Sequence, residues 1–227
     1  MKLILKFSLF FLVVLGVSSC DLDDDDNYYY NYWTGFGFVH FEDEAGTSYY
    51  FTLDDSTELY PVNTYSMEGI EDSDRVLISF IVVDEKNTNG EEEQYYVRLS
   101  SVDKLLYKEI LDITPSVEDS IGNDPIHVDH IFKSGKHLTL RLKFYGNTKT
   151  HYINLVKEPG EQTADDQPIH LELRHNDNDD QRYYEMLAYV TFDLSAIQIA
   201  DQDSVSYTIN GKDYDGADFS FQGVYHY

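Results

Sequence analysis

The 227-residue chain is poor in cysteine, in basic residues and in long apolar runs. Its single cysteine is Cys20, so no disulfide can form within the chain. Exported domains often depend on disulfides, and this one must instead depend on its hydrophobic core. The composition allows that, because 42% of the residues are hydrophobic and 15% are aromatic. After Cys20, no apolar run reaches the roughly 20 residues that a membrane-spanning helix needs.

The chain also has few basic residues. The chain has 16 lysines and arginines against 42 acidic residues, which gives a formal net charge of −26. A surface of this charge repels phosphate backbones, so nucleic acid is not expected as a partner. It also repels anionic lipid headgroups, so attachment to a membrane would need a lipid rather than a basic patch.

The N-terminus has the pattern of an export signal. Lys2 and Lys6 precede the apolar residues 9–15, a run too short for a lasting transmembrane helix. Val17, Ser18, Ser19 and Cys20 follow and resemble the bacterial lipobox, in which the cysteine thiol is acylated before cleavage. We therefore predict a signal peptide at residues 1–19 and lipidation of Cys20. The mature chain would keep 14 basic and 42 acidic residues, a net charge of −28, and two or more acyl chains would anchor it stably.

An acidic run follows the cysteine directly. It consists of Asp21, Asp23, Asp24, Asp25 and Asp26. Such runs are usually solvated, so residues 20–33 are predicted to form a tether. The position of the run also resembles the lipoprotein export signal of the Bacteroidota, which implies the outer membrane and exposure at the cell surface. The plain tether remains the alternative.

The rest of the chain is predicted to be all-β. In the first half, strands are expected at residues 34–42, 49–54, 58–62, 75–85 and 94–110, and the apolar run 76–83 indicates a strand buried on both faces. Five strands in this order predict a small OB-like barrel at residues 34–111. The interval 64–74 is short for the helix that such barrels often carry.

A second domain is predicted after residues 112–125, which contain Pro115, Gly122 and Pro125 and have the composition of a linker. Residues 126–227 then show about seven strands with alternating apolar residues. Leu138, Leu140, Leu142 and Phe144 form one such face. This pattern predicts an antiparallel β-sandwich.

Three stretches deserve consideration as metal sites. His127 and His130 are three residues apart, an odd spacing that puts them on opposite faces of a strand and disfavours zinc. The polar residues 176–180 lack the glycine and the distant glutamate of an EF-hand. Residues 213–218 are spaced for oxygen ligands, but an acidic hairpin turn has the same composition. We predict no metal, no cofactor, no catalytic residue and no enzymatic activity, and leave calcium binding by the Asp-rich turns open.

Several short stretches together resemble the NigD-like lipoproteins of the Bacteroidota, over essentially the whole chain. The most specific are Ser-Ile-Gly-Asn-Asp-Pro at residues 120–125 and Leu-Arg-His-Asn at residues 173–176; others lie at residues 50–55, 151–156 and 190–194. The resemblance implies an N-terminal OB-like domain and a C-terminal β-sandwich. The family takes its name from a presumed bacteriocin immunity protein, so the resemblance also implies a role of that kind. It implies no biochemical activity and no catalytic residue. We therefore expect a non-enzymatic binding or protective module. The alternatives are a glycan-binding accessory protein of a nutrient-uptake system and a structural envelope lipoprotein, and the partner, protein or glycan, is open.

Overall fold

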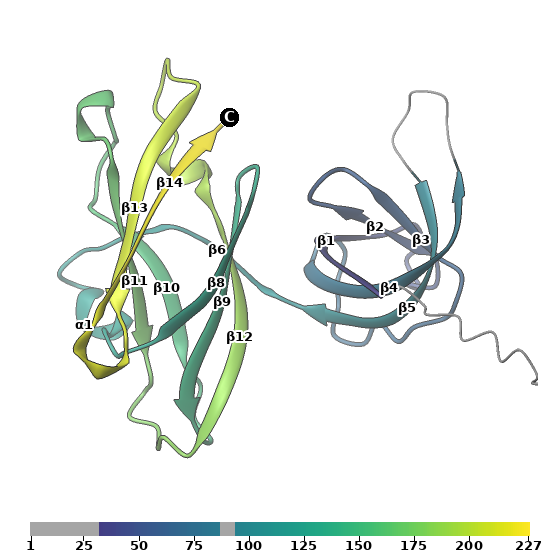
Figure 1. Cartoon of the computed structure of the whole chain (residues 1–227), viewed down its shortest axis with the longest axis horizontal. Coiled ribbons are helices and arrows are strands. Elements are labelled where there is room, and N and C mark those ends of the chain that lie inside the picture. Colours follow the sequence, from purple (N-terminus) through teal and green to yellow (C-terminus); the bar gives the residue numbers. More distant parts are fainter. Residues whose placement is uncertain (1–31, 87–93) are drawn as a thin grey trace, which may run out of the picture. The chain divides into compact units, whose positions relative to one another are not determined.

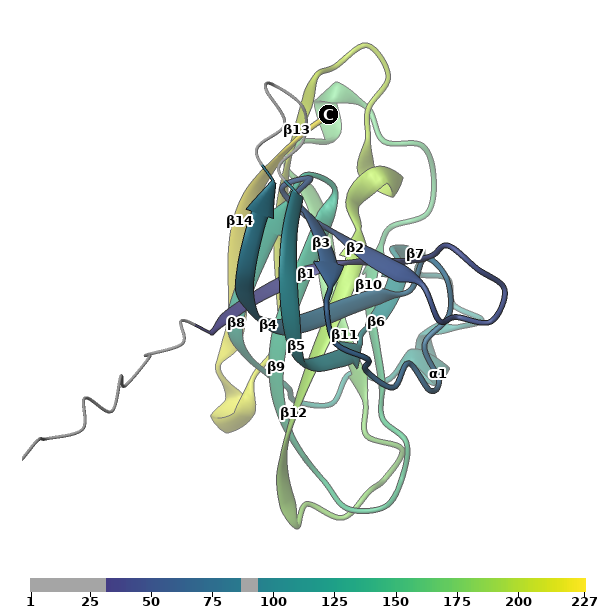
Figure 2. The same cartoon turned by 90° about the vertical axis from the view of Figure 1, so that its right-hand side faces the viewer.

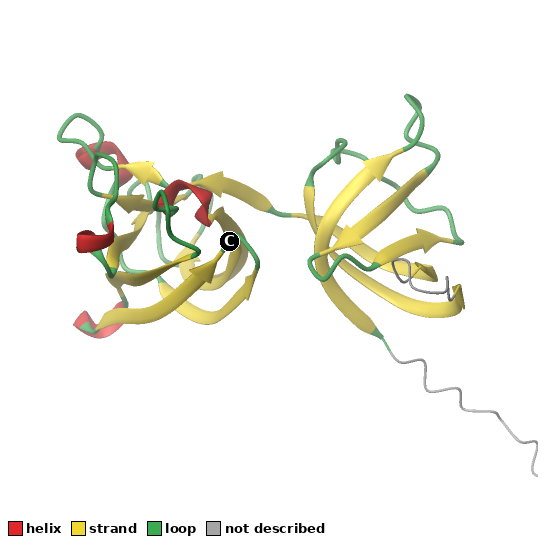
Figure 3. Cartoon of the chain, turned by 90° about the horizontal axis from the view of Figure 1, so that it is seen from above, coloured by secondary structure: helices red, strands yellow, loops and turns green. Residues whose placement is uncertain are grey.

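The structure is a computed structural model that describes residues 32–86 and 94–227 (Figure 1). The predicted signal peptide, Cys20, and the aspartates at positions 21, 23, 24, 25 and 26 lie outside the described residues. Strands dominate, and the few short helices lie between them (Figure 3). None of the helices within the two described ranges is long and apolar enough to cross a membrane.

The N-terminal strands form a closed five-stranded barrel, as predicted. They are β1 (Trp33–Phe41), β2 (Tyr49–Leu53), β3 (Glu58–Pro61), β4 (Arg75–Lys86) and β5 (Gln94–Lys104), in the order β1-β2-β3-β5-β4. β3 and β5 pair in parallel, whereas the other neighbours pair antiparallel. Val39, Phe51, Leu59, Val76 and Val97 are almost fully buried and fill the barrel.

The expectation that β4 is buried on both faces is wrong at its C-terminal end. Val76, Ile78 and Phe80 point into the barrel, but Val82 is 37% exposed and Val83 is 45% exposed. The pairing of β4 with β5 shifts at two irregularities, between Ser79 and Phe80 and between Val82 and Asp84. A bulge of this kind twists the strand and changes which side chains face the core.

A buried arginine of the barrel forms an ion pair with a partly buried aspartate. Arg75 is 1% exposed, and its guanidinium binds both carboxylate oxygens of Asp54, with Nη2 2.7 Å from Oδ2. The guanidinium also lies 4.9 Å from the ring centre of Phe38, within the range of a cation–π contact.

The C-terminal domain consists of two packed sheets. One has the order β14-β13-β11-β10-β7 and the other β6-β12-β9-β8. The strands are β6 (Leu106–Glu109), β7 (Leu111–Asp112), β8 (His127–Ser134), β9 (His137–Gly146), β10 (Tyr152–Lys157), β11 (Ile169–Asn176), β12 (Tyr184–Asp193), β13 (Ser204–Lys212) and β14 (Asp218–His226). Short helices occur at α1 (Glu118–Ile121), Ala164–Asp166, Leu194–Ile197 and Tyr214–Gly216. The long strands β9 and β12 lie side by side in Figures 1 and 2 and pair over their full lengths.

The alternating pattern read from the sequence lines the core of this sandwich. Leu138, Leu140 and Leu142 on β9 are fully buried, and Phe144 is 6% exposed. Leu171 and Leu173 on β11 and Phe192 on β12 are also buried in the same core. The two sheets therefore pack through one face each, as a sandwich requires.

The boundary between the domains lies earlier than the sequence suggested. We expected the barrel to extend to residue 111 and a linker at residues 112–125. Instead the last barrel strand ends at Lys104, β6 pairs with β12, and β7 pairs with β10. Ile110 and Ile121 are both 6% exposed. Residues 106–125 therefore belong to the sandwich, because these isoleucines are buried and the short strands extend its two sheets.

Candidate binding site in the sandwich domain

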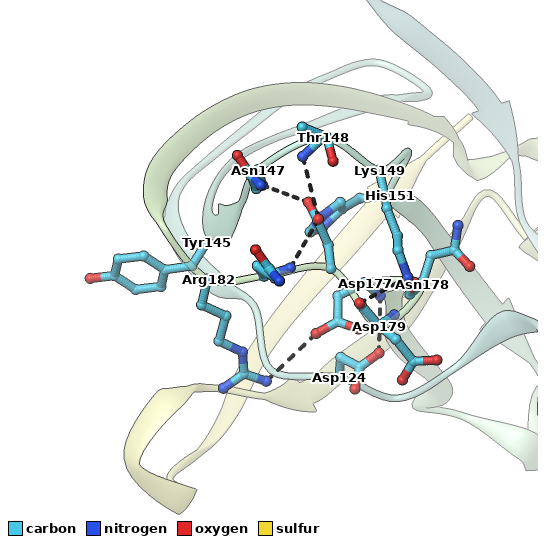
Figure 4. Close-up of polar contacts among 12 residues, drawn as sticks. Asp124, Tyr145, Asn147, Thr148, Lys149, His151, Asp177, Asn178, Asp179 and Arg182 are labelled. Carbon is cyan, nitrogen blue, oxygen red and sulfur yellow. Dashed lines mark hydrogen bonds and ion pairs between the residues drawn. The ribbon is translucent and has the colours of Figure 1, made fainter.

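A polar cluster holds together the β9–β10 and β11–β12 loops (Figure 4). Its centre is Asp180, whose carboxylate accepts hydrogen bonds from the backbone N–H of Asn147 at 2.5 Å, Gln181 at 2.9 Å and Thr148 at 3.3 Å. Burial raises the pKa of the Asp180 carboxyl, but these donors outweigh it and hold the pKa well below its usual range. Asp180 is therefore ionised and fixes one loop against the other.

The neighbouring acidic residues also bind their own loop. The Asp177 carboxylate accepts from the N–H of Asp179 at 2.9 Å and lies 3.6 Å from the Arg182 guanidinium. The Lys149 ammonium donates to the carbonyls of Asn178 and Asp179. In the described part of the chain, no group of three histidine, cysteine, aspartate or glutamate side chains is arranged to hold a metal ion. The acidic run at residues 176–180 thus shapes a turn, in which Asn178 and Asp179 take positive φ.

Two histidines extend the cluster into the domain. His151 Nε2 lies 3.3 Å from Asp180 Oδ2, and His151 Nδ1 lies 2.9 Å from His175 Nε2. His175 Nδ1 in turn lies 3.1 Å from the carbonyl oxygen of Pro125. Burial lowers the pKa of His175, although the Pro125 carbonyl opposes this effect. The side chains of His151 and Asp180 are only 4% and 2% exposed. The chain of contacts therefore positions loops and presents no reactive atom to solvent.

The two most specific stretches of the predicted family resemblance meet here. Arg174 Nε donates to the carbonyl oxygen of Gly122 at 2.9 Å, and Asn176 Nδ2 donates to that of Ser120 at 2.8 Å. Asp124 accepts from the N–H of Asp177 at 3.0 Å. These stretches are thus two sides of one contact that anchors residues 120–125 to the end of β11.

An open pocket of roughly 530 Å³ lies beside this cluster. It is lined by His127, Lys143, Phe144, Tyr145, Glu185, Asp213, Tyr214 and Ala217. The rings of Tyr145 and Tyr214 meet edge to face with their centres 5.4 Å apart. The backbone N–H of Tyr145 donates to the Tyr214 hydroxyl at 3.1 Å. Burial raises the pKa of that hydroxyl, so it stays protonated.

Most charged groups around the pocket contact a group of opposite charge. His127 Nδ1 lies 2.8 Å from Asp213, and the Asp129 carboxylate lies 2.7 Å from Lys143 and 3.0 Å from Arg141. Arg182, already bound to Asp177, lies 5.9 Å from the centre of the Tyr214 ring. Glu185 is the exception, since no described residue binds its carboxylate. The carboxylates around the pocket therefore outnumber the lysine and arginine side chains, and the Glu185 carboxylate is a free hydrogen-bond acceptor.

The expectation that His127 and His130 lie on opposite faces of their strand is wrong. His127 pairs with Lys143 and His130 pairs with Arg141, and the register shifts at the bulge between them. Lys143 and Arg141 are two residues apart and share a face, so the bulge at Asp129 puts both histidines on that face. Each contacts a carboxylate, His127 that of Asp213 and His130 that of Asp129.

The barrel has an aromatic row of its own, which sequence analysis missed. It crosses β1, β2, β3 and β5 through His40, Tyr50, Tyr60 and Tyr96, with successive ring centres 4.8, 5.6 and 6.1 Å apart. The first two pairs are stacked face to face. Their inner ring faces are therefore covered by one another, and the row is explained as a cross-strand ladder that stabilises the sheet.

The barrel and the sandwich with its loop cluster define a two-domain, all-β class of protein. The model of the NigD-like N-terminal OB domain matches residues 38–105, and that of the NigD-like C-terminal β-sandwich domain matches residues 109–222. The chain belongs to the NigD-like family. No curated protein matches it.

Solved structures show the same fold. A protein of unknown function from Bacteroides vulgatus is 19% identical, with a TM-score of 0.71 over 87% of this chain and 92% of that one. A NigD-like immunity protein from Bacteroides caccae is 19% identical, with a TM-score of 0.61 over 87% and 99%. A candidate lipoprotein from Bacteroides fragilis is 15% identical, with a TM-score of 0.61 over 87% and 98%.

Proposed function

We propose that this protein is a lipoprotein of the outer membrane, anchored through Cys20 and exposed at the cell surface, where it acts as a non-enzymatic binding or protective module. The observation that carries the proposal is the pairing of a lipobox with the complete two-domain fold of the NigD-like family. The similar fold of a candidate lipoprotein supports the anchor. The Asp180–His151–His175 contacts support a structural rather than a catalytic role for these residues, because the side chains are buried and hold two loops together. The open pocket on the same domain supports a binding role.

Protection against a toxin is the specific role that we propose first. It is supported by the family assignment and by the shared fold of the immunity protein from Bacteroides caccae. A survival assay tests it: a strain lacking the gene is exposed to culture fluid from related toxin-producing strains. Complementation with the wild type should restore survival, and Cys20→Ser, which lacks the anchor, should restore less. Equal survival of the deletion strain and its parent against every producer would contradict immunity.

The acidic run supplies the proposed route to the surface. Five carboxylates this close repel one another, and we propose that sorting machinery recognises this charge. Replacing Asp23, Asp24, Asp25 and Asp26 with serine and glycine removes the charge and keeps the length. Replacing the same residues with glutamate is the matched control. Protease added to intact cells should shave the wild type and the glutamate form but not the uncharged form. If all three are shaved equally, the run is only a tether.

A glycan-binding accessory role is the second candidate. The aromatic pocket between Tyr145 and Tyr214 favours it, because sugars are recognised by aromatic rings combined with a few fixed polar groups.

A further inference from the structure

We infer that the pocket between Tyr145 and Tyr214 binds a neutral sugar unit of an oligosaccharide. The inference rests on the proposal that the protein is a binding module, and it names the ligand class of one site. A volume of roughly 530 Å³ lies within the usual range of small-ligand pockets. One or two pyranose rings fit such a space.

The aromatic wall is suited to the flat C–H face of a sugar. Tyr145 is 40% exposed, so part of its ring is open to solvent. Its edge-to-face contact with Tyr214 places the two ring planes at 82°, which leaves a corner rather than a closed stack. The hydrogen bond from the Tyr145 backbone to the Tyr214 hydroxyl fixes the second ring against β9. Little side-chain entropy is therefore lost when a ligand stacks there.

The aromatic row of the barrel is less suitable for stacking against a sugar. His40 and Tyr50 are stacked at an interplanar angle of 26°, and Tyr50 and Tyr60 at 16°. Their rings thus cover one another, whereas the Tyr145 ring stands at 82° to that of Tyr214 and Tyr145 is 40% exposed. This difference selects the sandwich pocket over the barrel.

The charge pattern selects a neutral ligand. Lys143 and Arg141 share the Asp129 carboxylate, and Arg182 contacts Asp177. With Asp213 and Glu185, the carboxylates outnumber the lysine and arginine side chains, so no excess of positive charge draws an anionic sugar or a phosphate. A basic peptide is also disfavoured, because Arg182 already lies over the Tyr214 ring. The Glu185 carboxylate can accept from sugar hydroxyls, and the Lys143 ammonium can donate to them. Hydroxyl groups match both kinds of partner without bringing a net charge.

Calorimetric titration of the mature chain with neutral gluco-, manno-, galacto- and xylo-oligosaccharides tests the inference. Uronic-acid oligomers and a poly-lysine peptide are the charged comparisons. At least one neutral series should bind, and Tyr145→Ala should weaken it at least about tenfold, the usual effect of removing a central aromatic contact. Tyr145→Phe keeps the ring and should bind within a few-fold of wild type. Tyr60→Ala, on the barrel row, should bind as wild type does.

Three results would overturn the inference: no neutral series binds, binding depends on Tyr60 and not on Tyr145, or only the charged comparisons bind. Circular dichroism of each variant separates lost binding from lost folding. The toxin-survival assay is independent of this titration. Its failure would leave sugar binding intact, and failed sugar binding would leave immunity untouched.

Discussion

Gly122 is the residue whose replacement tests the loop anchor most sharply. Its backbone adopts φ 72° and ψ 179°, a region that is almost confined to glycine. An added Cβ would lie 2.6 Å from Asn176 Cβ, 2.8 Å from Asn176 Cα and 2.8 Å from the His175 carbonyl oxygen. Two of these three atoms belong to the backbone of β11, so they cannot rotate away. Gly122→Ala must therefore displace the end of β11 or the 120–125 segment.

The expected cost has two parts. Backbone strain contributes about 1–3 kcal/mol, and forcing a methyl group into a filled space contributes about 1–3 kcal/mol more. With a urea dependence of about 1–3 kcal/mol per molar, the unfolding midpoint of the sandwich should fall by about 1 M or more. Gly216→Ala is the matched control, because Gly216 has φ 75° and no atom within 4 Å of an added Cβ. Gly216→Ala should lose only the stability that backbone strain costs, about 1–2 kcal/mol.

Urea titration followed by circular dichroism measures both variants. If Gly122→Ala is no less stable than Gly216→Ala, the close approach of residues 120–125 to β11 is not a real constraint. The explanation that residues 120–125 and 173–176 occur in one chain because they contact each other would then be wrong.

Three further predictions follow from the fold. Asp54→Ala leaves the buried Arg75 charge without its partner and should cost about 3–5 kcal/mol of barrel stability, measured by urea unfolding. The double variant with Arg75→Met should recover much of this loss. Additive losses of the two substitutions would contradict the pairing. Because burial lowers the pKa of His175 below 6.5, folding favours its neutral form, so its stabilisation is present above pH 6.5 and is lost as the pH falls below that value. His175→Gln should therefore show a shallower loss of stability between pH 7 and pH 5, measured by urea unfolding at each pH, and an unchanged slope would refute this. Residues 106–227, expressed alone, should melt cooperatively, whereas residues 115–227, which lack β6 and β7, should be less stable or aggregate; equal melting of the two would argue that the short strands contribute nothing.

The sequence alone predicted most of the strands and the all-β class of the fold. Period-two alternation at Leu138, Leu140 and Leu142 predicts one buried face, because successive side chains of a strand point to opposite sides. The barrel strands were likewise predicted within a few residues, except after Lys104. There the polar composition of residues 112–125 suggested a linker. Composition does not reveal that Ile110 joins the core of the sandwich and that Ile121 is buried.

The candidate site was largely beyond prediction. His151 and His175 were noted in separate stretches, but only the pairing of Ile153 with His175 brings the two side chains together. Tyr145 and Tyr214 are 69 residues apart and meet through a hydrogen bond that no local pattern encodes. The shared face of His127 and His130 depends on a bulge. These contacts depend on strand register and on the packing of segments far apart in the chain, which a single sequence does not fix.

The central claim is that the mature protein begins at a lipidated Cys20. Mass spectrometry of the N-terminal peptide, from protein isolated from its own membranes, tests this most directly. The account predicts a mature N-terminus at Cys20, with the mass of a thioether-linked diacylglycerol on the cysteine. A peptide that spans Ser19 and Cys20, or a mature N-terminus carrying a free thiol, would contradict it.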